Sequence, residues 1–391
     1  SSGLSMKSKL ERVNYAVSEQ QKMQYVLYQG IAGELANKGI RFYPNFEPSE
    51  AMKAEIKRIF WGEIMPKLKL IPWGEEYWPM NQKKLRLMVK LQPKNGMDVR
   101  YAMVSYPGTP RLFKLPCEDG ATCLIRYEDV LRQWLWMMFS QDEIVEANAF
   151  RIIRNQEFPL DPQEDVSTAV REMLVKRTTG DVMRLEAEEG IGSETLSILA
   201  QRFQVPEDQL FIAQGPRDLS KLMMTCYAMI DRLDLKFKKE KQVIVHELMD
   251  SGIFKRIDER DWLLFHPYHS FDPVINLFSQ AALDPHVESI KATLYRVGNN
   301  SHVVRMLARA AEAGKQVTVI LETQARFDED DNLSNSERLR RAGCEVICGI
   351  RGLKTHSKAI LIARRENGAL KRYVHLGTGN YHEGNAKLYT D

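Results

Sequence analysis

The second half of the chain alternates short apolar segments typical of strands with amphipathic segments typical of helices. Strands are expected at 262–267, 289–297, 315–325 and 344–350, and helices at 273–283, 303–314 and 333–343. Crossovers of this kind are right-handed and join parallel strands within one sheet. This region is therefore predicted to fold as an α/β domain with a mainly parallel sheet.

Basic groups recur at or just after the ends of these predicted strands. They are His266 and His269 for the first strand, Arg296 for the second, Arg326 for the third, and Arg351 with Lys354 for the fourth. In an open sheet of this type, ligands bind beyond the carboxyl ends of the strands. Arginines that converge there can hold phosphate oxygens through paired N–H groups. We therefore expect an anion site at this edge.

A histidine stands between two lysines in the segment KTHSK, residues 354–358. The like charges of Lys354 and Lys358 should lower the pKa of His356, because they disfavour the imidazolium form. A neutral imidazole is a nucleophile. The alternative is a core histidine with satisfied hydrogen bonds, which would bring the two lysines into the interior at a high cost in free energy.

The same segment lies in a basic stretch, since residues 341–372 carry eight cations against two acids, whereas the whole chain has a net charge of only +3. For Arg364, Arg365, Lys371 and Arg372, which flank a predicted hairpin at 366–368, a solvated surface is an equally good explanation. The excess charge also fits the start of a path for a polyanion, whose binding should weaken with salt.

A glycine-rich turn follows the second strand of that hairpin, in HLGTGN at 375–380. Gly377 and Gly379 leave the backbone amides around Thr378 accessible to an oxyanion. We group Asn380 with them as a candidate phosphate-binding residue. A simple turn is the better explanation of this motif taken alone, and it gains weight from following HSK. The chain contains neither a P-loop motif nor GxGxxG.

The first half of the chain has a different texture. Residues 6–37 are predicted to form one long helix that Gly39 terminates. From about 40 to 240, strand-like and helix-like segments mix in an α+β pattern. A length of 391 residues with 44% hydrophobic content suits two or more domains, and we expect three parts at 1–37, 38–240 and 241–391.

Composition narrows the class of protein. No apolar run approaches the ~20 residues that cross a bilayer, and the first residues lack the pattern of a secretion signal. Five scattered cysteines argue against a disulfide framework and favour a reducing cytoplasm. The near-balanced charge does not indicate a general nucleic-acid binder. A zinc site from His266, His269, His356, His375 and His382 is an alternative, although no cysteine pair has the usual spacing.

HSK, followed by HLGTGN nineteen residues after its histidine, resembles the HxK motif of the phospholipase D superfamily. That superfamily normally has an acid later in the strand, where this chain has Ala363. A closer resemblance is to polyphosphate kinases of the long, histidine-phosphorylating type. The segments that carry it, in that family's order, are HPYHSFDPV, LYRVGNNS, ETQARFDEDDNL, GLKTHSKAILIARRENG, RYVHLGTGNYHEG and KLYTD. The resemblance implies a phospholipase D-like α/β catalytic domain preceded by an α+β head domain.

The resemblance also implies a role for each matching residue. His356 would be the autophosphorylated nucleophile with Lys358 beside it, and Tyr389 in KLYTD would contact ATP. Arg296 and Arg326 match arginines of a magnesium and phosphate site. Because a guanidinium has no lone pair to offer a metal, we expect these arginines to hold phosphate oxygens that in turn hold Mg²⁺.

Four acids that follow Arg326 are more suited to capping a helix start than to approaching the ion. They are Asp328, Glu329, Asp330 and Asp331. The implied reaction is the reversible transfer of the ATP γ-phosphate to inorganic polyphosphate, with ADP as product. The family implies a homo-oligomer, dimer or tetramer, in the cytoplasm, and peripheral association with a membrane is left open.

Two other functions remain open at this point. A phosphatidyl or phosphodiester transferase would use the same histidine chemistry without ATP, and a non-catalytic polyanion-binding module would bind without a covalent intermediate. The resemblance further implies that residues 1–37 are the last helix of an N-terminal domain and that the chain ends inside the first of two catalytic domains. Activity of the piece alone is therefore in question.

Overall fold

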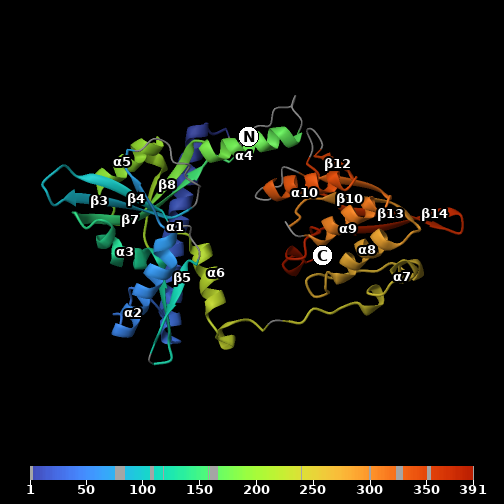
Figure 1. Ribbon diagram of the computed structural model, residues 1–391, viewed down its shortest axis with the longest axis horizontal. Helices are drawn as coiled ribbons and strands as arrows, with labels where there is room; N and C mark the ends of the chain where they lie inside the picture. Colours follow the sequence, from blue (N-terminus) through green and yellow to red (C-terminus); the bar gives the residue numbers. More distant parts are fainter. Residues whose placement is uncertain are drawn as a thin grey trace. The chain divides into compact units, whose positions relative to one another are not determined.

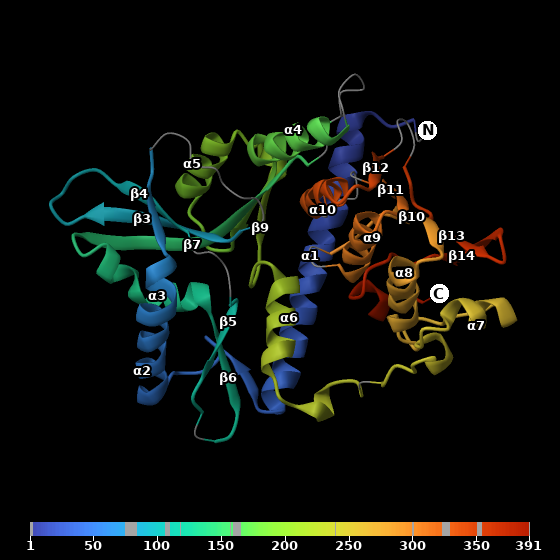
Figure 2. The ribbon, with the colours of Figure 1, turned by 45° about the vertical axis from the view of Figure 1, so that its right-hand side comes forward.

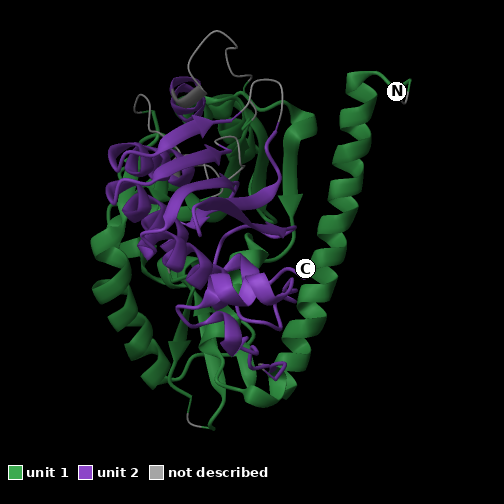
Figure 3. Ribbon diagram, turned by 90° about the vertical axis from the view of Figure 1, so that its right-hand side faces the viewer, with its two compact units in different colours: residues 1–158, 175–235 green, residues 159–174, 236–391 purple. Residues whose placement is uncertain are grey.

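The structure, a computed structural model, describes residues 3–74, 84–105, 110–117, 119–156, 158, 166–238, 240–298, 301–322, 329–349 and 354–390. The chain divides into two compact units, residues 1–158 with 175–235 and residues 159–174 with 236–391 (Figure 3). Each unit is described by itself below. The division into parts at 37/38 and 240/241 stays a prediction.

The first unit opens with the long helix α1 (Met6–Asn37), which confirms the prediction for 6–37. The hydroxyl of Ser5 caps its start by accepting the Ser8 N–H at 3.2 Å. Gly39 follows its end with φ +80°, a conformation that glycine adopts without steric cost. The chain then enters β1 directly.

The rest of the first unit consists of two sheets and several helices (Figure 1). One has the order β2 (Lys69–Pro72), β4 (Arg100–Ser105), β3 (Arg86–Pro93), β7 (Asp142–Arg154), β8 (Val182–Glu188) and β9 (Leu210–Ala213). The other has the order β1 (Ile40–Phe42), β6 (Thr122–Arg126) and β5 (Leu112–Leu115). The helices are α2 (Glu50–Ile59), α3 (Tyr127–Met138), α5 (Ser193–Phe203) and α6 (Leu219–Met229), with α4 (Val166–Thr179) shared between the units. The predicted α+β pattern is confirmed.

The second unit contains one five-stranded sheet, in the order β12 (Glu345–Cys348), β11 (Gln316–Leu321), β10 (Val287–Leu294), β13 (Lys358–Glu366) and β14 (Ala369–Gly377). Its helices are α7 (Ile253–Glu259), α8 (Asp272–Leu283), α9 (His302–Glu312) and α10 (Glu329–Arg341), visible in Figure 2. Apolar residues of the strands and of α8 and α9 share one core, which includes Phe278, Val304 and Val319. The α/β prediction for this region is confirmed.

Two details of that sheet differ from the sequence expectation. β10, β11 and β12 are parallel to one another, but β13 runs antiparallel to both of its neighbours, β10 and β14, so the sheet is mixed. Its hairpin turns at Asn367 and Gly368, both with positive φ, as the predicted turn requires. The strand expected at 262–267 is absent, and the isolated bridge nearby joins His269, beyond this segment, to Val243. Trp262 and Leu264 pack against the core without joining a ladder, whereas Leu263 and Phe265 are exposed.

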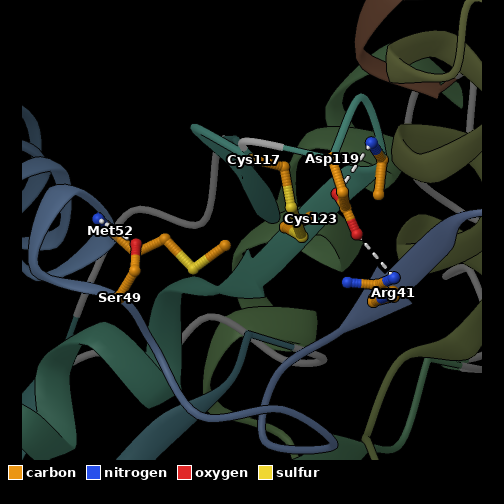
Figure 4. The surroundings of a disulfide bond; sticks show 7 residues. Arg41, Ser49, Met52, Cys117, Asp119 and Cys123 are labelled. Atoms are coloured by element: carbon orange, nitrogen blue, oxygen red, sulfur yellow. Dashed lines mark hydrogen bonds and ion pairs between the residues drawn. A yellow bond between two sulfur atoms is a disulfide. The ribbon is translucent and has the colours of Figure 1, made fainter.

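The sequence argued against a disulfide framework, but the structure contains one disulfide. Cys117 and Cys123 are joined at a Cα–Cα distance of 6.3 Å (Figure 4). Cys123 lies in β6 and Cys117 follows β5, so the β5–β6 register brings them together. Cysteine spacing alone does not reveal such a register. Cys226, Cys344 and Cys348 are buried thiols.

None of the helices in the described ranges combines the length and the apolar character needed to span a membrane.

Candidate functional site

The site is built where β10 ends beside the segment that leads into β13. The hydroxyl of Thr293 donates to the carbonyl of Ser357 at 2.7 Å and accepts the Ala359 N–H at 2.9 Å. The strands pair in register from Ala292 opposite Ile360. Tyr295 follows Leu294, the last residue of β10. The two Thr293 hydrogen bonds therefore hold the segment around Ser357 against the end of this strand.

Buried polar groups tie three strand ends together. The Asn332 amide in α10 donates to the Tyr295 carbonyl at 2.8 Å and to the Glu322 carbonyl at 2.9 Å. The Glu322 carboxylate accepts the Thr355 N–H at 2.8 Å. Asn332 and Glu322 are 0% and 1% exposed. Together they connect the end of β10, the end of β11 and the residue before His356.

Sequence reasoning missed both of these residues. The only signals were a glutamate at the end of the apolar run 317–321 and an asparagine within a helix otherwise amphipathic in pattern. A buried carboxylate or amide needs partners, so each was a candidate for a structural network. Neither signal identifies the partner.

We expect Asn332→Ala to lower the free energy of unfolding by about 2 kcal/mol, because two carbonyls lose their donor. Urea unfolding followed by circular dichroism measures this loss. Asn95→Ala is the matched control, since the Asn95 side chain makes only an exposed turn contact with the Met97 N–H. Equal stability of the two variants would contradict the role of Asn332.

His356 itself is exposed at this edge. Its imidazole lies edge-on to Tyr295, with ring centroids 4.8 Å apart and ring planes at 79°. The Lys358 ammonium group lies 5.1 Å from the centroid of the Tyr295 ring, and that of Lys354 lies 5.8 Å from it. One histidine and two lysines thus surround a single tyrosine ring.

The electrostatics of this cluster favour the neutral imidazole. Desolvation lowers the pKa of His356 below its ordinary value, and the charges of Lys358 and Lys354 lower it further. Lys358 is 4% exposed and donates to the His356 carbonyl at 2.7 Å. Desolvation lowers the pKa of Lys358 as well. A neutral nucleophile therefore stands beside positive charge at neutral pH.

The glycine-rich turn lies against Tyr389. A Cβ added to Gly379 would stand 2.0 Å from Cζ of the Tyr389 ring, so only glycine fits there. The Tyr389 hydroxyl donates to the Asn380 carbonyl at 3.3 Å, and the ring contacts His266 edge-on. These contacts fix Tyr389 on the turn that follows β14.

A mostly apolar cavity of about 720 Å³ borders this turn. Gly377, Thr378, Gly379, His266 and Tyr389 contribute to its wall, together with Leu, Ile, Val and Trp side chains. His356 does not line it. The cavity and His356 are therefore separate features of one unit, and the cavity alone would not have led to His356.

Comparison with known proteins decides the family. Residues 51–225 match the model of the polyphosphate kinase middle domain, and residues 252–391 match that of the polyphosphate kinase C-terminal domain 1. The chain belongs to the polyphosphate kinase family. The resemblance drawn from six short segments is confirmed.

Individual relatives agree. A polyphosphate kinase of Exiguobacterium sp. is 36% identical over 100% of this chain and 55% of its own length, and polyphosphate kinase 1 of Chlorobaculum tepidum is 37% identical over 100% and 57%. The crystal structure of polyphosphate kinase from Porphyromonas gingivalis superposes with a TM-score of 0.76 and 25% identity, covering 98% of this chain and 57% of that one. The chain thus spans little more than half the length of these family members.

The structure places some of the residues expected in a polyphosphate kinase site and leaves others outside the described residues. Arg296 follows Tyr295 and is half-buried. Arg326, Asp328 and Arg351 lie outside the described residues, as do the side chains of Glu329 and Asp330. Asp331 lies in the first turn of α10, where a carboxylate favours the helix dipole.

The histidines proposed as alternative zinc ligands have other partners. Nδ1 of His266 contacts the His269 carbonyl at 3.0 Å, and Nδ1 of His375 contacts the Tyr381 hydroxyl at 2.9 Å. Nδ1 of His382 accepts two backbone N–H groups in its own turn. Within the described ranges, no three His, Cys, Asp or Glu side chains are grouped so that they could hold a metal ion.

The basic stretch divides into two parts. Arg364 pairs with Asp284 at 2.7 Å, Arg365 pairs with Glu288, and Lys371 pairs with Asp258 at 2.5 Å. These pairs favour the solvated-surface explanation for the hairpin cations. Lys354 and Lys358, by contrast, gather at the Tyr295 ring beside His356. Lys354 and Lys358 are therefore the described cations of this stretch that lie beside His356.

Proposed function

We propose that the protein transfers the γ-phosphate of ATP to inorganic polyphosphate through a phosphohistidine on His356, and that the reaction is reversible. The observation that carries this proposal is the exposed His356 imidazole with its lowered pKa, set between two lysines at the edge of the sheet. Membership of the polyphosphate kinase family supports it. In the reverse direction, polyphosphate and ADP give ATP.

The reaction proceeds in two displacements. A ring nitrogen of neutral His356 attacks the γ-phosphorus, an N–P bond forms, and the bond to the bridging oxygen breaks as ADP leaves. A terminal oxygen of polyphosphate then attacks the same phosphorus, and the N–P bond breaks to restore the imidazole. Lys358 and Lys354 stabilise the negative charge on the transferring group, because their ammonium groups lie beside the nucleophile.

We propose that Mg²⁺ binds to the protein as part of its complex with ATP. The described residues offer no cluster of carboxylates for a resident ion. A magnesium ion held by the phosphate oxygens of ATP needs only groups that hold the phosphates, and Arg296 and Arg326 are proposed for that role. Bound in this way, the ion would reduce the charge on the nucleotide as it approaches His356.

The nucleotide base is assigned to Tyr389 and the apolar cavity. The aromatic ring and the apolar wall suit a planar base, and the backbone amides of 377–379 together with Asn380 suit phosphate oxygens.

The proposal also includes a cytoplasmic location and a homo-oligomeric state of the protein. Light scattering after gel filtration tests the oligomeric state.

The decisive test is incubation with ATP and Mg²⁺ followed by intact-mass measurement and acid treatment. We expect a single phosphoryl adduct that acid removes, because phosphoramidates are acid-labile whereas phosphoserine is not. Addition of polyphosphate should discharge the adduct and lengthen the polymer by one phosphate. An adduct that survives acid, or transfer of phosphate with no adduct, would refute the covalent route.

Gly379→Ala should weaken ATP binding roughly tenfold, about the loss expected when one aromatic ring no longer stacks on a base. The added methyl group would displace Tyr389, whose ring occupies that space. Calorimetric titration with ATP measures the change. Gly33→Ala in α1 is the control, since no atom lies within 4 Å of its added Cβ. In a Tyr389→Leu background, Gly379→Ala should have no further effect.

A further inference from the structure

Tyr295 has an unusual set of neighbours. Its ring contacts the His356 imidazole edge-on at 4.8 Å, and the ammonium groups of Lys358 and Lys354 lie 5.1 and 5.8 Å from its centroid. The backbone of Tyr295 is fixed by the buried Asn332 amide. Thr293, two residues earlier and within β10, holds Ser357 and Ala359. The ring is therefore a fixed surface against which the reactive groups lie.

A role in packing alone does not account for this arrangement. Tyr295 is half-buried, and among the described residues it is neither a member of the hydrophobic core of its unit nor one of the partly buried residues packed on that core. Within the described ranges, its aromatic and cation contacts are with His356, Lys354 and Lys358. Tyrosine at this position therefore serves that segment more than the core.

The nucleophile needs such a contact. Within the described part of the chain, no group forms a hydrogen bond with a ring nitrogen of His356. A reactive histidine is commonly oriented by a hydrogen bond to its second nitrogen. Here an edge-to-face aromatic contact restricts the imidazole while both nitrogens stay available for reaction and proton exchange.

We propose that Tyr295 is a positioning residue whose ring orients the His356 imidazole and gathers the Lys354 and Lys358 ammonium groups around it for phosphoryl transfer. This inference rests on the proposed function. The negative face of the ring attracts both cations, so they remain near His356 without forming a salt bridge that would neutralise them. The charges are then available to the incoming phosphate.

The test compares Tyr295→Leu with Tyr295→Phe, which keeps the ring and loses only the hydroxyl. Histidine-selective NMR of the nucleotide-free protein, with His356→Ala to assign the resonance, follows the titration of His356. We expect Tyr295→Leu to abolish the ring-current shift of His356 and to raise its pKa, because the ammonium groups are no longer held nearby. Tyr295→Phe should retain both features.

Kinetics supply the second readout. Tyr295→Leu should slow phosphorylation of His356 by about tenfold at saturating ATP, with little change in the ATP concentration at half-saturation, because orientation of the nucleophile and not ATP binding is lost. Tyr295→Phe should react at nearly the wild-type rate. Tyr268→Leu is the control, since that ring is 55% exposed and its aromatic contact among the described residues is a tilted one with Phe265.

Two outcomes would overturn the inference: a His356 titration that is identical in Tyr295→Leu and wild type, or equal loss of rate in the Phe and Leu variants, which would transfer the role to the hydroxyl. Circular dichroism establishes that each variant is folded. Because the titration needs no nucleotide, a wild-type protein that takes up no phosphoryl group would refute the phosphohistidine reaction separately from the role of the ring.

Discussion

His356→Ala is expected to abolish phosphorylation of the protein by ATP and to reduce polyphosphate synthesis by more than about a thousandfold. In the proposed reaction the imidazole supplies the nitrogen of the N–P bond, so the substitution removes the phosphoryl acceptor. Loss of a nucleophile that acts within a preorganised group has effects of this size or larger. Intact mass before and after acid treatment detects the adduct, and incorporation of labelled phosphate into polymer measures synthesis.

His286→Ala is the matched control for that substitution. His286 is a surface histidine of the same unit, with a 62% exposed side chain that pairs with Asp284. The His286→Ala variant should still be fully phosphorylated at His356. An adduct of equal size in His356→Ala would assign the phosphoryl group to another residue. Binding of ATP and polyphosphate without any adduct in wild type would instead favour the non-catalytic, polyanion-binding alternative.

Much of the second unit was predictable because its local patterns agree with its tertiary structure. The alternation of apolar and amphipathic segments gave β10, α9, β11, α10 and β12 in order, and Asn367–Gly368 gave the β13–β14 turn. The strand prediction for 262–267 was wrong because Trp262 and Leu264 can pack on the core without any pairing of the backbone, and a short apolar run does not distinguish the two cases. The antiparallel direction of β13 depends on how a loop returns to the sheet, which periodicity does not encode.

Some features of the candidate site could likewise be predicted from the sequence, and others could not. The sequence places Lys354 and Lys358 next to His356, so the direction of the His356 pKa shift followed from sequence alone. The contacts of Tyr295, Glu322 and Asn332 required the structure, because they join residues 33 to 61 positions apart in the sequence. Those contacts depend on strand order and register, and a linear motif contains neither.

Lys358→Met is expected to slow phosphorylation of His356 by roughly a hundredfold to a thousandfold, the range for removing one preorganised donor from a transition state that develops charge. Methionine is unbranched like lysine and only one atom shorter, so the nearly buried position should stay largely filled. Stopped reactions analysed by intact mass give the rate. Lys255→Met, an exposed lysine of α7, should leave it unchanged.

The same substitution should move the pH dependence in a defined direction. Lys358 and Lys354 both act to lower the pKa of His356, so the wild-type rate should stay on its plateau below the ordinary histidine pKa of about 6.5 and fall only at lower pH, as the imidazole becomes protonated. Removing the Lys358 charge raises the His356 pKa, so the acid limb of Lys358→Met should shift to higher pH. A lower rate with an unshifted acid limb would mean that Lys358 acts on the phosphate alone and leaves the protonation of the nucleophile to desolvation and Lys354.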